Sequence, residues 1–294
     1  MDSPLAEPSR IGAGVVTVSY GSQDVLVDFL ASVPAASVLP SYVVVTDNLA
    51  SSDSPVAKLA DDAQAKYVAM ESNVGYGTAM NAGVALLPPE IEWVLLSNPD
   101  VVLTAGAIDE LIRVAAQDAR IAAVGPAIRT SDGEIYPSAR AVPSLRTGVG
   151  HALFVNLWVE NPWTRAYRTD RAAAAIQRDA GWLSGACLLV RRTSFEKVGG
   201  FDPGYFMYFE DVDLGYRLGK AGYRNVYVPT AVATHSGAHA TTAESNRMIS
   251  EHHRSARRFL NRKYSGGWLW PIRVTLTIGL QLRSTLMRRR MGAN

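Results

Sequence analysis

The sequence predicts an α/β fold in which helices cover both faces of a mostly parallel sheet. Short apolar runs alternate with helical patterns throughout the first half of the chain, as in proteins built from repeated strand–helix units. The first run, residues 14–20, has the composition of a buried strand. Hydrophobic residues make up 48% of the 294 residues, which is typical of a folded globular protein and excludes a disordered one.

The predicted strands and helices of this first half follow each other in regular order. Ligands bind at the carboxyl ends of the strands in such sheets, so the polar residues Asp47, Asn98 and Asp100 mark a candidate site. The predicted strands are residues 14–20, 42–48, 67–70, 93–97 and 122–126, and the predicted helices are residues 24–33, 55–65, 78–87 and 105–117.

The second half of the chain is less regular. Residues 135–175 contain three prolines and are predicted to form a loop with short helices. An apolar strand is expected over 183–191, a strand-like run over 225–229 and a basic helix over 248–264. The chain contains one cysteine, Cys187, which excludes an internal disulfide framework and fits a reducing compartment.

Charge divides the chain into an acidic body and a basic tail. Residues 247–294 carry eleven Lys or Arg and one acid, which gives a net charge of +10. The rest of the chain carries eighteen Lys or Arg and twenty-six acids, which gives a net charge of −8. We therefore expect a main domain over residues 1–240 and a basic amphipathic helical tail over 241–294. Arg273 leaves an uncharged run too short to span a bilayer. Tryptophans beside arginines fit an anchor on anionic lipid, and packing on the protein itself or a dimer contact is the alternative.

Three carboxylates within four residues give the strongest local signal. Glu210, Asp211 and Asp213 follow a run rich in aromatic residues. Acids in the first turn of a helix are favoured by the helix dipole, so a capped surface helix is one reading. The aromatic wall favours the other reading, a general base that holds a substrate hydroxyl. Arg217 is placed to pair with Asp213 one turn on, which would leave Asp211 free.

Two polar segments after strands fit a nucleotide. Asp47 could accept hydrogen bonds from a nucleobase or a ribose, or it could simply cap a turn. Gly75 and Gly77 precede a helix, where close backbone approach and free N–H groups suit a nucleotide's sugar or phosphates. An ordinary glycine turn is the alternative, because the segment is neither a GxGxxG motif nor a P-loop.

A divalent cation could bind at two further positions. Asp100, in the segment Asn98-Pro99-Asp100, could coordinate Mg²⁺ or Mn²⁺ that also holds a substrate diphosphate, although a turn residue would look the same. His235 would be neutral near pH 7 and able to ligate a cation, or it could be a hydrogen-bonded histidine without a ligand. His239 is a second candidate for this role.

Taken in order, these motifs resemble the family 2 glycosyltransferases of the GT-A (Rossmann-like) fold, and within them the rhamnosyltransferase branch. The resemblance runs from about Val15 to about His239. It rests on Ser19-Tyr20, Thr46-Asp47-Asn48 with Ser52 and Asp53, Asn73-Val74-Gly75-Tyr76-Gly77 with Asn81, Asn98-Pro99-Asp100, Gly185-Ala186, Gly199-Gly200-Phe201-Asp202, Glu210-Asp211-Val212-Asp213-Leu214 and His235.

The resemblance implies a role for each matching residue. Asp211 is implied as the catalytic base, and Asp100 and His235 as ligands of Mg²⁺ or Mn²⁺. Asn98 departs from the family's Asp-X-Asp signature, and a neutral amide is a poorer ligand for a hard cation. The residues implied to bind the donor are Tyr20, Asp47, Asn73, Gly75, Gly77 and Asn81.

The resemblance also implies an activity and a location. The expected reaction is inverting transfer of L-rhamnose from dTDP-β-L-rhamnose to a polyprenyl-diphosphate-linked GlcNAc, in synthesis of the cell-wall arabinogalactan linker. Trp182 would stack on the acceptor sugar or pack in the core. The expected location is cytoplasmic and peripheral on the inner face of the plasma membrane, with no nucleic-acid partner and with a homodimer as an option.

Three other classes stay open at this point. A same-fold transferase could use another nucleotide sugar such as UDP-galactose. A protein of the same fold could bind nucleotide sugars without catalysis. A nucleotidyltransferase would carry a glycine- and Lys/Arg-rich phosphate loop after the first strand, and residues 20–24 lack one.

Overall fold

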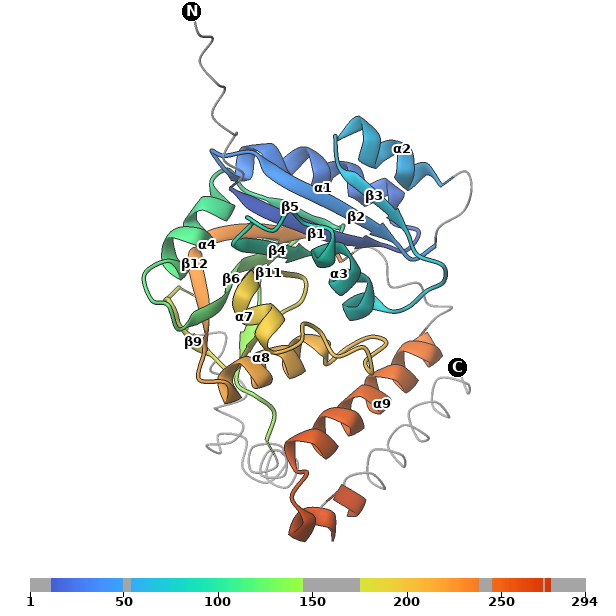
Figure 1. The fold of residues 1–294 in the computed structure, drawn as a ribbon, viewed down its shortest axis with the longest axis vertical. Helices are drawn as coiled ribbons and strands as arrows, with labels where there is room; N and C mark the ends of the chain where they lie inside the picture. The colour runs from blue at the N-terminus through green and yellow to red at the C-terminus, as the bar shows by residue number, and fades with distance from the viewer. Residues whose placement is uncertain (1–11, 50–53, 145–174, 238–244, 272, 276–294) are drawn as a thin grey trace, which may run out of the picture.

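A ten-stranded sheet forms the centre of the computed structural model, which describes residues 12–49, 54–144, 175–237, 245–271 and 273–275 (Figure 1). The main strand order is β3-β2-β1-β4-β11-β6-β12-β5, with β7 paired to β6 and β9 paired to β12. These strands are β1 (Ala13–Ser19), β2 (Ser41–Asp47), β3 (Lys66–Ala69), β4 (Trp93–Ser97), β5 (Val101–Leu103), β6 (Ile121–Thr130), β7 (Ile135–Tyr136), β9 (Arg178–Ala180), β11 (Cys187–Arg191) and β12 (Arg224–His235).

The sheet is mixed and mostly parallel in its first half, as the alternation of strands and helices predicts. β3, β2, β1 and β4 are parallel neighbours, and β6 and β12 are also parallel. β11 runs antiparallel between β4 and β6, and β5 runs antiparallel to β12. The register aligns Ser19 with Asp47 and Thr17 with Ser97, so the carboxyl ends of β1, β2 and β4 lie at the same edge of the sheet.

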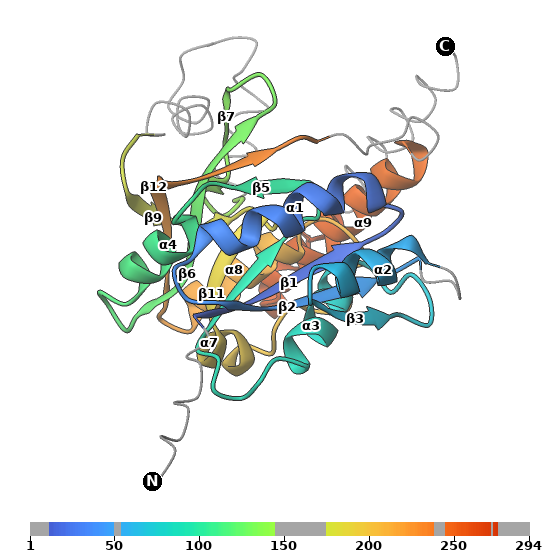
Figure 2. The ribbon, with the colours of Figure 1, turned by 90° about the horizontal axis from the view of Figure 1, so that it is seen from above.

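Helices cover both faces of the sheet, which explains why the strands are apolar on both sides. Val15 packs into the cluster that contains side chains of α1, α2 and α4, whereas the adjacent Val16 packs into the cluster of α3, α7 and α8. Figure 2 looks onto the face that α1 crosses. The helices are α1 (Gln23–Ala36), α2 (Pro55–Asp62), α3 (Tyr76–Ala85), α4 (Ala107–Ala115), α7 (Arg192–Lys197), α8 (Glu210–Lys220) and α9 (Ser245–Lys263).

Two predicted strands differ from those observed. The run expected over 183–191 is broken into β10 (Trp182–Leu183) and β11, and β10 pairs with β8 (Ala139–Arg140) in a separate small sheet. The run expected over 225–229 continues to His235, because a register shift after Val228 takes Pro229 out of the ladder. Of the predicted loop 135–175, residues 145–174 lie outside the described part of the chain.

The first helix of the basic tail packs on the body beside the start of α8. Phe259 of α9 is fully buried with Tyr205 and Val212, and the Ser255 hydroxyl donates to the carbonyl of Met207 over 2.8 Å. Farther along, Trp268 is 80% exposed, and residues 276–294 fall outside the description. Within the described ranges, no helix combines the length and the apolarity that crossing a bilayer requires.

Candidate functional site

A cleft of about 290 Å³ opens at the carboxyl ends of β1 and β4, where the sequence predicts a site. Its walls come from six separate parts of the chain: the turns after β1, β2 and β4, the loop before α3, the loop before α8, and one face of α9. The lining residues are Val18, Tyr20, Ser22, Asn48, Asn73, Gly75, Tyr76, Asn98, Pro99, Asp100, Phe206, Met207, Met248 and Glu251.

Asp100 and His235 meet at one end of this cleft. The histidine Nε2 lies 3.0 Å from Oδ1 of Asp100, and the Asn98 side-chain nitrogen lies 3.5 Å from the same Nε2. The antiparallel pairing of β12 with β5 produces this contact, because it aligns His235 with Val101 and lets Ser236 N–H donate to the carbonyl of Asp100. Asp100 and His235, which are 135 positions apart in the sequence, are thus in direct contact.

This donor set fits a cation that is shared with a substrate. Among the described residues, no group of three or more His, Cys, Asp or Glu side chains could enclose a metal ion alone. Mg²⁺ is ordinarily held by one or two carboxylates together with phosphate oxygens and water. The Asp100 carboxylate beside an open cleft matches that pattern, with the His235 imidazole as a second ligand and the Asn98 amide as a weaker neighbour.

Asp211 lies in the first turn of α8 and is held by main-chain donors. Its Oδ2 accepts the Gly185 N–H over 2.9 Å, and its Oδ1 accepts the Val212 N–H over 2.7 Å. Burial raises the pKa of Asp211 above the ordinary aspartate value, and these hydrogen bonds oppose the shift. Tyr208 and Phe209 before it both have a φ of +65°, a conformation that bulky residues seldom adopt outside functional sites.

The expected pairing of Arg217 with Asp213 is confirmed. The guanidinium lies 2.5 Å from the carboxylate, which is fully buried and also accepts from Arg262 of α9. Arg217 additionally donates to the carbonyls of Val198 and Gly200. The charge of Asp213 is therefore used to hold α8 in place, and Asp211 is the acid left near the cleft.

Glu210 is a buried acid that the sequence did not distinguish from its neighbours. Its side chain is 7% exposed, and Oε2 has no hydrogen-bond partner among the described residues. Burial, with a further contribution from the charge of Asp211, raises the pKa of Glu210 to about 8. Two adjacent carboxylates with raised pKa values are typical of a catalytic site.

Tyr76 joins the cleft to Asp211, and sequence reasoning missed it. Its hydroxyl donates to the carbonyl of Gly185 over 2.6 Å, while the N–H of the same glycine donates to Asp211. Burial and the nearby negative charges of Glu210 and Asp211 raise the pKa of Tyr76, so it stays a hydrogen-bond donor. The signal in the sequence is its position directly after Gly75, at the start of α3.

Three of the predicted donor-binding residues line the cleft. Tyr20 is partly exposed there, and Asn73 accepts the Gly75 N–H over 3.1 Å. Gly75 has a φ of +84°, and a Cβ at this position would lie 2.2 Å from the carbonyl oxygen of Phe206. Gly75 therefore allows the loop before α3 to pack against the loop before α8.

The other three do not line the cleft; Asp47 and Gly77 are buried, and Asn81 is half-buried. The Asp47 carboxylate accepts hydrogen bonds from the Leu49 N–H and from the hydroxyls of Ser54 and Tyr67. Its neighbour Asn48, and not Asp47, lines the cleft. A Cβ on Gly77 would lie 2.8 Å from Phe201. The Asn81 amide both donates to and accepts from the main chain of Phe201, over 2.8 and 2.9 Å.

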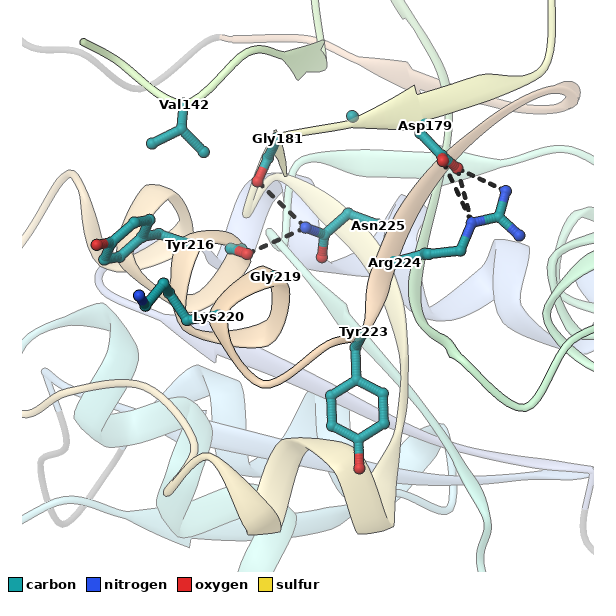
Figure 3. A pocket seen from close by; sticks show the side chains of 11 residues that line it. Val142, Asp179, Gly181, Tyr216, Gly219, Lys220, Tyr223, Arg224 and Asn225 are labelled. Atoms are coloured by element: carbon teal, nitrogen blue, oxygen red, sulfur yellow. Dashed lines mark hydrogen bonds and ion pairs between the residues drawn. The ribbon is translucent and has the colours of Figure 1, made fainter. Parts of the chain in front are cut away.

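A second hollow of about 260 Å³ lies beside α8, on the side of β9 and β12 (Figure 3). Asn225 at its centre donates to the carbonyls of Gly181 and Gly215, and Arg224 at its rim pairs with Asp179. None of the predicted site residues is among its described lining. Trp182 does not line either hollow, and its indole N–H donates to the carbonyl of Ala141 over 3.1 Å.

Sequence comparison finds a family that covers most of the chain. The family described as "Glycosyltransferase like family 2" matches residues 11–257. The chain is 45% identical over 284 residues, 94% of this chain and 92% of the relative, to a Mycobacterium tuberculosis protein named N-acetylglucosaminyl-diphospho-decaprenol L-rhamnosyltransferase. It is also 44% identical over 82 residues, 28% of this chain and 31% of the relative, to the rhamnosyltransferase WbbL of Escherichia coli.

Solved structures share the fold at low sequence identity. The mannosyltransferase PcManGT from Pyrobaculum calidifontis, in complex with GDP-Man and Mn²⁺, aligns with a TM-score of 0.57 and 15% identity over 95% of this chain and 74% of that one. GalNAc-T7 with UDP, GalNAc and Mn²⁺ aligns with a TM-score of 0.59 and 14% identity over 85% of this chain and 47% of that one. The GT-A glycosyltransferase fold expected from the sequence is confirmed.

Proposed function

Because the chain belongs to glycosyltransferase family 2, we propose that it transfers L-rhamnose from dTDP-β-L-rhamnose to a polyprenyl-diphosphate-linked GlcNAc, in synthesis of the cell-wall arabinogalactan linker. The observation that carries this proposal is 45% identity across nearly the full length of a relative that bears that activity in its name. Geometry supports it as well, since an acid with a raised pKa lies beside a cleft with a candidate cation site at its end.

Asp211 takes the proton from the acceptor hydroxyl in the proposed mechanism. The deprotonating oxygen attacks the anomeric carbon from the face opposite the diphosphate, so the configuration at that carbon inverts. A pKa raised above the ordinary value makes Asp211 a better proton acceptor near neutral pH. The N–H groups of Gly185 and Val212 fix the direction of its two oxygens.

Asp100 and His235 would hold Mg²⁺ or Mn²⁺ together with the donor diphosphate. A cation bound there would offset the negative charge that builds on the leaving group. The two fold relatives have structures that contain Mn²⁺, which supports the use of a divalent cation by this architecture in general. Asn98 in place of an acid lowers the affinity of the site for a hard cation.

The nucleoside end of the donor would lie against Tyr20 and Asn73, with the main chain at Gly75 close to it. Asp47, Gly77 and Asn81 support the same loops from beneath, through the hydrogen bonds and close contacts described above.

The tail would keep the enzyme at the inner face of the membrane that carries its acceptor. Trp268 and Trp270 are exposed, as an interfacial anchor requires. A dimer contact through the same surface is the competing use of these side chains.

A screen of nucleotide sugars tests the proposal. Purified protein is given the GlcNAc-diphosphoryl-polyprenol acceptor and one donor at a time, including dTDP-β-L-rhamnose and UDP-galactose, and the product is identified by mass. Addition of one deoxyhexose from the rhamnose donor alone is the expected result. A hexose product from UDP-galactose would reassign the donor, and the absence of product with every donor would favour a non-catalytic binding protein.

A further inference from the structure

One face of α9 forms part of the cleft, although the sequence assigns this helix to a separate tail. Met248 and Glu251 line the cleft together with Met207 and Phe206 of the loop before α8. Both residues lie on the basic, mostly polar helix whose positive charge suggested a membrane role. The helix therefore brings one acidic side chain into the space proposed for the donor.

The position of this face is fixed by contacts farther along the same helix. Residues 251, 255, 259 and 262 are spaced three or four apart and so lie on one side of α9. Ser255 donates to the Met207 carbonyl, Phe259 is fully buried, and Arg262 pairs with Asp213 and Asp202. These contacts begin at Ser255, one turn after Glu251. The packing of α9 therefore directs the Glu251 side chain toward the cleft.

The Glu251 carboxylate has an acceptor that no described residue satisfies. The side chain is 20% exposed, Oε2 is buried without a hydrogen-bond partner in the described part of the chain, and Oε1 lies 3.6 Å from Arg254. A buried acceptor without a donor destabilises the protein, more so when it carries charge. A ligand that supplies a donor at this point would remove that cost.

The chemistry of a carboxylate restricts what this ligand group can be. An ionised carboxylate only accepts hydrogen bonds, and it repels phosphate oxygens. Glu251 also forms no cluster of three metal-ligating side chains with Asp100 and His235 in the described part of the chain. In the cleft proposed for the donor, the available donors are the hydroxyl groups of the nucleotide sugar and the single N–H of its base, and the hydroxyl groups are the more numerous.

We infer that Glu251 accepts a hydrogen bond from a hydroxyl of the bound nucleotide sugar, on its ribose or on the transferred sugar, and so contributes to donor specificity. Identifying the donor as dTDP-β-L-rhamnose rests on the proposed function. A site that pairs a buried charge with a substrate hydroxyl rejects analogues lacking it, because the charge is then left unpaired.

The test measures the affinity of dTDP and of dTDP-β-L-rhamnose by calorimetry for wild-type protein, Glu251→Ala and Glu251→Gln. A hydrogen bond to a charged group predicts binding weaker by about 10- to 100-fold for the alanine variant. The glutamine variant keeps an acceptor oxygen and should lose less. Glu196→Gln, at an exposed acid that pairs with Arg192 on α7, is the matched control and should bind like wild type.

Each outcome decides the inference. Equal losses for both ligands place the donor group on the thymidine half, where the 3′-hydroxyl is the only hydroxyl, and a loss confined to the nucleotide sugar places it on the rhamnose. Wild-type affinity for both ligands in Glu251→Ala, with an unchanged melting temperature, overturns the inference. If wild-type protein does not bind dTDP-β-L-rhamnose, the proposed function fails instead. The same variants are then measured with the donor that the screen identifies.

Discussion

Gly185 donates its main-chain N–H to the Asp211 carboxylate over 2.9 Å, and this contact joins the break between β10 and β11 to the first turn of α8. The carbonyl of the same glycine accepts from Tyr76, which lines the cleft. One peptide segment thus connects the proposed base with the loop proposed to hold the donor. Asp211 is connected to the cleft through Gly185 and Tyr76, and His235 through Asp100. Neither Asp211 nor His235 is among the described lining residues.

Replacing the proposed base should abolish most of the activity. We expect Asp211→Asn to lower kcat by about 10²- to 10⁴-fold, because loss of a general base typically has this effect. In wild-type protein, kcat should fall on the acid side with an apparent pKa above 3.8, since burial raises the pKa of Asp211. Asp28→Asn, at an exposed site on α1, is the control. Turnover near the wild-type rate in Asp211→Asn would exclude the role.

Removing the Tyr76 hydroxyl should affect the chemical step through Gly185. Tyr76→Phe keeps the ring and loses the hydrogen bond to the Gly185 carbonyl, which contributes about 0.5–1.5 kcal/mol in a typical case. We expect kcat to fall by about 2- to 10-fold, with a smaller change in the KM for the donor. A rise in KM with kcat unchanged would show instead that Tyr76 acts only in donor binding.

Two substitutions at the cation site should change the metal concentration needed for activity in opposite directions. Chelation should remove activity, and Mg²⁺ or Mn²⁺ should restore it. His235→Ala should raise the metal concentration needed for half-maximal rate, because one of two protein ligands is lost. Asn98→Asp should lower that concentration, because it adds a hard anionic ligand next to His235. Activity that is insensitive to chelation in all three proteins would contradict the assignment.

Much of this arrangement is predictable from the sequence, and the remainder depends on tertiary contacts. Periodicity predicts the first strands and helices, and strand ends predict Asp100, because parallel strands place their carboxyl ends together. Neither Tyr76 nor Glu251 stands out locally. Their positions depend on the loop before α8 packing against Gly75 and on α9 folding back over Met207. No local pattern encodes such distant contacts.

Glu210 should make the protein less stable as the pH rises. Its pKa is about 8 in the folded protein and near 4.5 in the unfolded chain, so the folded state holds a proton that the unfolded state has lost. The free energy of unfolding should therefore fall between pH 4.5 and 8, by at most about 1.4 kcal/mol per pH unit, and level off above. Urea unfolding across this range should show a shallower slope for Glu210→Gln than for wild type. An identical slope in both would show that Glu210 does not retain its proton.

Truncation after Tyr264 separates the two uses of the basic tail. The cut keeps α9 with its Ser255 and Phe259 contacts, and it removes the exposed tryptophans and five arginines. Each basic residue near an anionic surface contributes about 1 kcal/mol to binding, so co-sedimentation with anionic vesicles should fall by at least tenfold. Donor affinity should stay at the wild-type level, because the wall formed by α9 is intact. Neutral vesicles serve as the control, since the charge-dependent part of binding is missing from them. Unchanged partition on anionic vesicles would place the membrane contact within residues 1–264. Lost donor affinity would show that the segment after α9 is needed to hold that helix in place.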